Sequence, residues 1–285
     1  MNKKRLSQTG KPRLPDKPRR GPASSDERQS AHRAAPETSS PSVIFGVLPV
    51  LEALRSNSRR IDKIAIADGA GEHRLSEIVR LARENGVTVN RTPRANFSKY
   101  VDPSLNTQGV IAFTSPVDYA DASGLIDTAP DNALMLILDG VEDPRNLGAV
   151  LRSAECAGVD GVFIPERRAV GLTDTVAKSS AGAIEYVKVA KVANLNRLIE
   201  KMKERNIWVI GTSGDAETSY TDWDWTRPSA IVLGAEGSGL HRLVAENCDM
   251  LVKIPMYGKI DSLNVSVAAG VIMFEVRRQR SSKKE

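Results

Sequence analysis

Six short apolar runs in the second half of the chain constrain its fold more than any other feature. Each run is five or six residues long, as expected for a buried strand, and helical patterns separate most of them. Strands that alternate with helices form a mainly parallel sheet with helices on both faces, and such sheets bind ligands at the carboxyl ends of their strands. The sequence therefore predicts an α/β fold whose strands span residues 133–138, 161–165, 185–189, 207–211, 230–234 and 250–254.

A smaller α/β module precedes this sheet. Residues 43–117 alternate between helical and extended patterns, and Gly86 ends one of the helices. Residues 118–132 are rich in Asp, Ala, Ser, Gly and Pro, which predicts a linker with one helical turn. The larger unit then covers residues 133–285. Within the module we expect helices at 47–55 and 74–85, and strands at 61–67, 87–91 and 110–113.

The first 42 residues carry the whole positive excess of the chain. They hold ten of the 40 Lys and Arg residues and four of the 35 Asp and Glu residues, so the remainder has 30 basic and 31 acidic side chains. A segment rich in Pro, Ser, Gly and Arg without periodic apolar residues buries too little surface to offset the entropy lost on ordering. We therefore predict a disordered basic tail over 1–42, either an arm that binds a polyanion such as RNA or a solubilising leader.

Composition and cysteine usage favour a cytoplasmic protein. No segment approaches the roughly 20 apolar residues of a membrane-spanning helix, and the basic start lacks the apolar stretch of a secretory signal. Cys156 and Cys248 fit neither a zinc spacing nor a disulfide framework, so we expect buried, reduced thiols. Neither a membrane nor a metal is expected as a partner.

Residues 253–270 have the pattern of a binding loop between a strand and a helix of small residues. Ser262 and Asn264 stand at the predicted helix start, where free backbone N–H groups and side-chain amides can converge on a ligand. Apolar neighbours suit a flat heterocycle held by main-chain groups, in contrast to a triphosphate held by lysines. These neighbours are Ile254, Met256 and Leu263.

A second candidate loop follows the first strand of the larger unit. A turn through Pro144 leads into a helix that carries Asn146 and Arg152. A separation of six residues places the two within roughly 120° of each other on the helix surface, so they can flank one pocket. The alternative is a helix-capping asparagine and a solvated arginine.

A third candidate loop, residues 231–240, ends a strand in a glycine-rich turn. Glu236 lies between Gly234 and Gly237, and the glycines allow a ligand to approach the backbone closely. The loop lacks the G-x-G-x-x-G spacing of a dinucleotide site, and no P-loop lysine follows. These absences argue against NAD-dependent and nucleotide-hydrolysing activities.

Together the three loops resemble the three signature motifs of the SpoU (TrmH) family of RNA 2′-O-methyltransferases. The segments that carry the resemblance are Asn146 to Arg152, Gly234-Ala-Glu-Gly237, and Ile254-Pro-Met with Ser262-Leu-Asn264. The module at 43–117 is similar to the L30e-like RNA substrate-binding domain found in one branch of the family. The resemblance implies a trefoil-knotted SPOUT methyltransferase domain that binds S-adenosylmethionine (SAM) and forms a homodimer through the helix after the third motif.

The resemblance also implies roles for individual residues. Arg152 activates the ribose 2′-hydroxyl, and the residues that position it or the ribose are Asn146, Glu236, Ser262 and Asn264. The adenosine part of the cofactor is held by Gly234, Ile254 and Leu263, and the same cavity is lined by Thr212, Gly237 and Met256. The pKa of an arginine side chain lies above about 12, so a neutral arginine that acts as a base is costly at physiological pH. Two alternatives to the base role are stabilisation of the alkoxide and a proton relay to the RNA phosphate.

The substrate implied by the resemblance is large-subunit ribosomal RNA. The branch with this substrate-binding domain methylates a guanosine in the P loop of the 23S RNA peptidyl-transferase centre. Alternatives are another ribosomal or transfer RNA ribose, and a non-catalytic assembly factor that binds ribosomal RNA. Basic residues of the module could contact RNA phosphates or form an ordinary solvated face; they are Arg55, Arg59, Arg60, Arg91, Arg94 and Lys99.

Overall fold

The computed structural model describes residues 42–282, and at Glu72 and Arg74 it describes the backbone alone. Apart from Ser42, the predicted basic tail lies outside the described residues. No helix in this described part is both long enough and apolar enough to cross a membrane.

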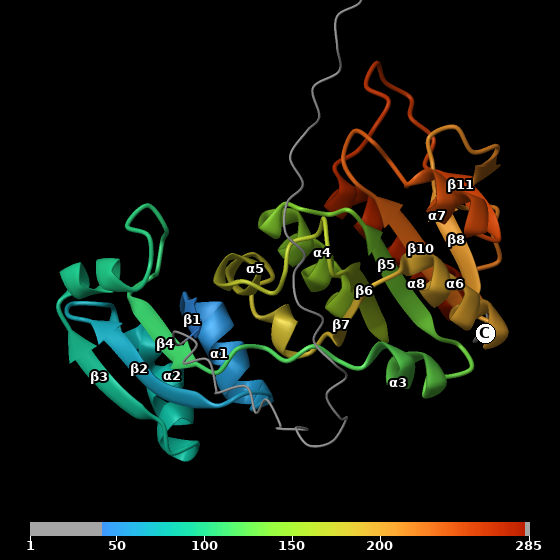
Figure 1. Ribbon diagram of the computed structural model, residues 1–285. Coiled ribbons are helices and arrows are strands. Elements are labelled where there is room, and N and C mark those ends of the chain that lie inside the picture. Colours follow the sequence, from blue (N-terminus) through green and yellow to red (C-terminus); the bar gives the residue numbers. More distant parts are fainter. Residues whose placement is uncertain (1–41, 283–285) are drawn as a thin grey trace, which may run out of the picture. The chain divides into compact units, whose positions relative to one another are not determined.

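The first part of the described chain folds around a four-stranded mixed sheet in the order β1-β4-β2-β3. β4 runs antiparallel to both β1 and β2, whereas β2 and β3 are parallel. Helices α1 and α2 pack on one face of the sheet (Figure 1), and the turn η1 packs on the other. The elements are β1 (Ser42–Phe45), α1 (Val47–Ser56), β2 (Ile61–Ala67), α2 (Glu72–Glu84), β3 (Thr88–Thr92), η1 (Arg94–Lys99) and β4 (Val110–Thr114).

The second part folds around a seven-stranded sheet in the order β7-β6-β5-β10-β8-β11-β9, and every pair of neighbouring strands is parallel (Figure 1). Its strands are β5 (Leu134–Asp139), β6 (Gly161–Pro165), β7 (Val189–Val192), β8 (Trp208–Thr212), β9 (Thr218–Ser219), β10 (Ser229–Gly234) and β11 (Met250–Lys253). Its helices are α3 (Ala122–Asp127), α4 (Pro144–Cys156), α5 (Asp174–Ser179), η2 (Ala183–Glu185), α6 (Leu195–Glu204), α7 (Arg242–Asn247) and α8 (Val265–Ser282).

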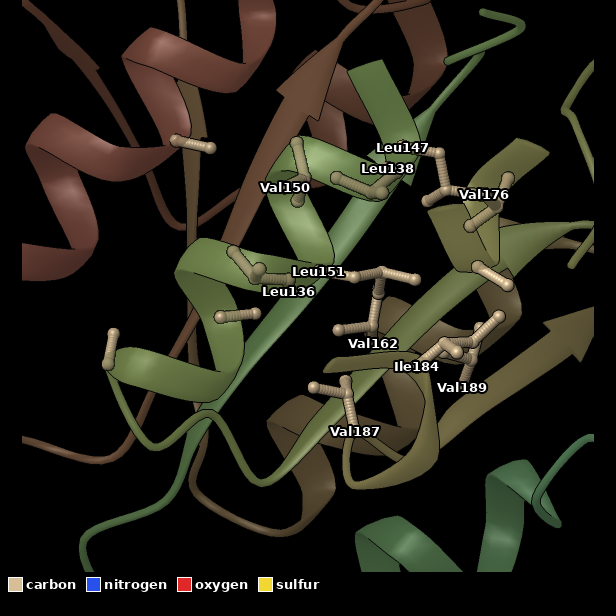
Figure 2. Close-up of a cluster of buried hydrophobic side chains, with 14 of the residues drawn as sticks. Leu136, Leu138, Leu147, Val150, Leu151, Val162, Val176, Ile184, Val187 and Val189 are labelled. Atoms are coloured by element: carbon tan, nitrogen blue, oxygen red, sulfur yellow. The ribbon is translucent and has the colours of Figure 1, made fainter. Parts of the chain in front are cut away.

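Both faces of this sheet are buried, which explains why its strands read as continuous apolar runs. Successive side chains of a strand point to opposite faces, and β5 divides accordingly. Leu136 and Leu138 pack with α4 and α5, as Figure 2 shows, whereas Met135 and Ile137 pack with α6 on the other side. The predicted α/β fold with a mainly parallel sheet is therefore confirmed.

The prediction placed one strand of the larger unit too early. Residues 185–189 were expected to be extended, but Ala183–Glu185 forms a 3-10 turn and β7 begins at Val189. The turn follows Gly182, whose φ of 93° reverses the chain direction. The Glu185 carboxylate is also buried in an ion pair with Arg59. In the sequence Glu185 has the pattern of a solvent-facing strand residue, but in the fold a distant partner holds it in place.

The prediction of two buried thiols was wrong for Cys156, which is exposed at the end of α4. Cys248 is largely buried, and burial raises the pKa of its thiol to about 12. Both cysteines are free. Burial raises the pKa of the Cys156 thiol as well, so the surroundings of both sulfurs disfavour the thiolate form.

Arg280, in the last turns of α8, fastens this helix to the amino-terminal edge of the second sheet. Its guanidinium donates to the carbonyl oxygens of Trp225 at 2.9 Å, Asn132 at 2.5 Å, and Ala133 and Arg227 at 3.1 Å each. Partial burial lowers the pKa of Arg280, but the side chain stays charged at any physiological pH. One side chain therefore satisfies four carbonyl groups from two separate loops.

We expect Arg280→Ala to lower the free energy of unfolding by about 2–3 kcal/mol, because four carbonyl groups lose a charged donor. Urea denaturation followed by circular dichroism measures the change. Arg242→Ala is the control, since Arg242 forms an exposed pair with Glu246 that contributes about 0.5 kcal/mol. Equal stability of the two variants would contradict the anchoring role of Arg280.

Candidate active site

Three of the predicted catalytic residues meet at the carboxyl ends of β5 and β10. The Asn264 Nδ2 amide donates to Asn146 Oδ1 at 3.0 Å and to Glu236 Oε1 at 2.6 Å. Its Oδ1 atom accepts from the backbone N–H of Ser266 at 3.0 Å, and so caps the start of α8. The Val265 N–H also donates to Glu236 Oε1, at 3.4 Å. One asparagine thus ties the three predicted motif loops together.

The local sequence explains how Asn146 reaches this cluster. Asp143 caps α4 by accepting from the backbone N–H of Arg145 at 2.7 Å, and Pro144 occupies the first helical position, where no N–H is needed. Asn146 consequently lies in the first turn of α4, facing the loop after β10. The capping residue is Asp143, so the alternative reading of Asn146 as a helix cap is wrong.

Arg152 and Ser262 lie outside this hydrogen-bonded cluster. Both side chains are exposed, and no hydrogen bond in the described part of the chain joins either to Asn146, Glu236 or Asn264. Arg152 projects from α4 nearly two turns after Asn146, close enough to Cys156 to lower the thiol pKa slightly against the dominant effect of burial, which raises it. The guanidinium is therefore free to meet a substrate.

The six predicted cofactor residues lie in or next to three loops at the carboxyl ends of neighbouring strands. Thr212 ends β8, Gly234 ends β10, and Ile254 directly follows β11, and these three strands are parallel neighbours. The turn after Gly234 is so tight that a Cβ atom there would lie 2.1 Å from the carbonyl carbon of Gly239. The loops also contain Gly237, Met256 and Leu263.

The main chain of residues 254–263 has the hydrogen-bonding capacity that a heterocycle requires. Within the described chain, none of its N–H or carbonyl groups bonds to another backbone group or to a side chain. Ile254 is half-buried against the core, while Leu263 is 39% exposed. Since residues 257–263 are exposed, these main-chain groups are accessible to solvent or to a bound ligand.

A pocket of about 350 Å³ adjoins the catalytic cluster. Asn146 and Glu236 line it, together with Gly140, Val141, Glu142, Asp143, Arg168, Ala235, Ser238, His241 and Val265. Arg168 comes from the loop after β6 and Val265 from the start of α8, and the other walls come from the first turn of α4 and the loops after β5 and β10. Strands β5 and β10 are neighbours at the centre of the sheet, and from them the chain continues toward opposite edges of the sheet. Parallel sheets commonly bind ligands at such a switch point.

Sequence reasoning missed Asp139 and His241, which also belong to this site. Asp139 is only 3% exposed, and its carboxylate accepts the His241 backbone N–H and contacts His241 Nδ1, both at 2.8 Å. Asp139 ends β5 and pairs in register with Gly234 of β10. A carboxylate that ends an otherwise apolar strand was the signal that could have identified it.

The structure corrects one part of the predicted RNA-contacting patch. Arg59 is buried, and its guanidinium pairs with the Glu185 carboxylate, so it cannot contact a phosphate. Arg55 pairs with Glu52 and Glu77 at the surface. Arg94 and Lys99 are exposed on η1 and remain candidates. Among the residues that the structure describes, no three His, Cys, Asp or Glu side chains are grouped so that they could hold a metal ion.

Two family models match the chain. Residues 133–274 match the SpoU rRNA Methylase family, and residues 43–120 match the family described as RNA 2′-O ribose methyltransferase substrate binding. The chain is 42% identical over 245 residues to the 23S rRNA (guanosine-2′-O-)-methyltransferase RlmB of Pseudomonas syringae pv. tomato, covering 85% of this chain and 97% of that protein. It is 44% identical over 241 residues to YacO of Bacillus subtilis, provisionally named a TrmH family tRNA/rRNA methyltransferase, covering 84% and 96%.

Solved structures agree with this assignment. A crystal structure of an RNA 2′-O ribose methyltransferase aligns with a TM-score of 0.72 and 26% identity, covering 84% of this chain and 88% of that one. The fold is also that of the SpoU methyltransferase AviRb from Streptomyces viridochromogenes, with a TM-score of 0.72, 23% identity, and coverage of 85% and 91%. The chain therefore belongs to the SpoU family of SAM-dependent RNA 2′-O-methyltransferases.

Proposed function

We propose that this protein methylates the 2′-oxygen of a guanosine in 23S ribosomal RNA, in the P loop of the peptidyl-transferase centre. The hydrogen-bonded cluster of Asn146, Glu236 and Asn264 is the observation that carries the proposal, because a decayed site would not keep three polar side chains in register. The similarity to a 23S rRNA guanosine methyltransferase along nearly its whole length supports the choice of substrate. Such a substrate also implies a cytoplasmic location.

The chemistry that we propose requires positioning and proton removal. The 2′-oxygen attacks a methyl carbon in line with the departing sulfur, so the site must align the reactants and exclude water. The Glu236 carboxylate, held by Asn264, orients the ribose hydroxyls, and Asn146 fixes the Asn264 amide in turn. The exposed guanidinium of Arg152 stabilises the developing alkoxide as the hydroxyl proton passes to a phosphate oxygen of the RNA, and Ser262 completes the wall around the ribose.

We assign the cofactor to the loops after β8, β10 and β11. When bound, SAM supplies the methyl group. The unpaired main-chain groups of residues 254–263 would hold its adenine, Ile254 and Leu263 would cover the ring, and the tight turn at Gly234 keeps the site open. Thr212, Gly237 and Met256 complete the cavity. No ionisable side chain is needed there, in keeping with a heterocycle bound by the backbone.

We further propose the domain boundaries and the dimer. A substrate-binding domain would span residues 43–117, a linker 118–132, and the knotted methyltransferase domain 133–285. The homodimer would use α8, since Val267 and Phe274 are 50% and 52% exposed and, seven residues apart, lie on the same face of the helix. Large apolar side chains exposed along one helical face favour association with a second copy.

We expect Phe274→Asp to convert the dimer into monomers, because burying a charged carboxylate in the interface would cost its hydration free energy. Size-exclusion chromatography with light scattering measures the mass. Leu48→Asp is the matched control, since Leu48 is 51% exposed on α1, far along the chain from α8, and it should leave the mass unchanged. A Phe274→Asp protein that still has the wild-type dimer mass would refute this interface.

A transfer RNA substrate is the second candidate, because the similar YacO protein carries a name that covers both tRNA and rRNA. Transfer of labelled methyl groups from SAM to 23S rRNA, 16S rRNA and bulk tRNA, each made without modifications, separates the possibilities. We expect label in 23S rRNA alone. Label in tRNA would replace the proposed substrate, and tight rRNA binding without any transfer would favour the assembly-factor alternative.

A further inference from the structure

The pocket beside the catalytic cluster contains several side chains with unused hydrogen-bonding capacity. Asn146 and Glu236 are already bonded to Asn264, and Asp143 caps α4. In contrast, Glu142 and Arg168 have no hydrogen bond or ion pair within the described chain, although both line the pocket. The Ser238 hydroxyl is also unbonded within the described chain, as is the Nε2 atom of His241, whose Nδ1 atom is occupied by Asp139.

The loop that carries Arg168 is held in an unusual conformation over this pocket. Arg168 has a φ of 57°, in the left-handed region that a non-glycine residue adopts only at some cost. The backbone N–H of Val170 donates to the Val141 carbonyl at 3.1 Å, so the loop after β6 is fastened to the loop after β5. The fold thereby brings the loop that carries Arg168 next to the loop that carries Glu142, and both side chains are exposed.

Guanine is the base whose edges match these groups. Its Watson–Crick edge presents two adjacent donors, N1–H and N2–H₂, which one carboxylate can accept together, whereas adenine, cytosine and uracil lack such a pair. Its O6 and N7 atoms are acceptors on another edge, and a guanidinium binds them in a bidentate manner. A base that has left its helical stack is read through these same edges.

We propose that this pocket binds the guanine of the target nucleotide, with Glu142 accepting from N1–H and N2–H₂ and Arg168 donating to O6 and N7. The inference rests on the proposed function and adds the residues that recognise the guanine. The pocket's volume of about 350 Å³ suits a single base, and its position beside Asn146 and Glu236 leaves the attached ribose at the catalytic cluster. His241 forms part of the pocket wall and is held in place by the buried Asp139 carboxylate.

The test uses a short 23S rRNA fragment that contains the target guanosine, and copies with inosine or 7-deazaguanosine at that position. Inosine lacks the N2 amino group, and 7-deazaguanosine lacks the N7 acceptor. Two quantities are measured for each RNA: the single-turnover rate of methyl transfer, and the equilibrium affinity in the presence of S-adenosylhomocysteine. The proteins are the wild type, Glu142→Gln, Arg168→Ala and the control Glu246→Gln, which removes the same charge from an exposed pair on α7.

We expect the wild type to favour guanosine over inosine by about 10- to 100-fold, as for a bidentate base contact. Glu142→Gln should reduce this preference to less than about 3-fold while Glu246→Gln keeps it. Arg168→Ala should lose the preference against 7-deazaguanosine alone. A wild type that treats guanosine and inosine alike, or a Glu142→Gln protein with the full preference, would overturn the inference. Since affinity is measured without transfer, the pocket is tested even where the proposed activity fails.

Discussion

Arg152→Ala is expected to reduce the single-turnover rate of methyl transfer by about 10²- to 10⁴-fold, the range for loss of a group that assists proton removal. Arg152 is exposed on α4, six residues after Asn146, and lies outside the hydrogen bonds of the Asn146, Glu236 and Asn264 cluster. Truncation should therefore leave the fold and the affinity for SAM unchanged. Rapid-quench kinetics with labelled SAM and saturating RNA measures the rate, and calorimetry measures cofactor binding.

Two companion variants sharpen this prediction. Arg152→Lys keeps the charge but loses the planar fork of donors, so its rate should lie between those of the wild type and Arg152→Ala. Arg197→Ala is the control, because Arg197 is exposed on α6, whose apolar side chains pack on the opposite face of the sheet from α4. A rate for Arg152→Ala within a factor of two of the wild type would remove Arg152 from the mechanism.

Glu185→Ala is expected to lower the free energy of unfolding by about 3–5 kcal/mol, the usual cost of breaking a buried ion pair. The side chains of Arg59 and Glu185 are 5% and 1% exposed, and Ser58 also donates to the carboxylate, at 2.7 Å. Without the carboxylate, the guanidinium is left buried and unpaired. Guanidinium chloride denaturation followed by tryptophan fluorescence measures the change.

Two further variants separate the loss of the ion pair from a general effect of substitution on stability. Glu84→Ala breaks the exposed Arg80–Glu84 pair of α2 and should cost at most about 0.5 kcal/mol. The double variant Arg59→Met with Glu185→Leu removes both charges and should recover most of the loss, because an apolar pair carries no desolvation cost. A double variant no more stable than Glu185→Ala would show that packing, and not charge, dominates at this position.

The sequence predicted the sheet well because strands that are buried on both faces appear in the sequence as continuous apolar runs. Strands β5, β6, β8, β10 and β11 lie within one residue of the expected apolar runs. The strand at β7 was misplaced because Glu185 and Val189 follow an extended pattern, while the partner that buries Glu185 lies 126 residues earlier in the chain. Contacts over such separations leave no periodic signal.

Short sequence motifs revealed only part of the site. Motif resemblance identified Asn146, Glu236 and Asn264, and the structure adds the hydrogen bonds through which Asn264 links them. Spacing alone could not reveal the pair of Asp139 and His241, because a strand end and a helix start 102 residues apart meet only through the sheet register. The roles of all five predicted catalytic residues stay predictions, and Arg152 and Ser262 do not join the cluster.

The most direct test of the central claim is to map the product of methyl transfer to unmodified 23S rRNA by nuclease digestion and mass spectrometry. We predict a single 2′-O-methylguanosine in the P loop, formed by the wild type and absent with Arg152→Ala. A methyl group on a base, on another kind of nucleotide, or on no RNA at all would contradict the proposal that this chain is a 23S rRNA guanosine 2′-O-methyltransferase.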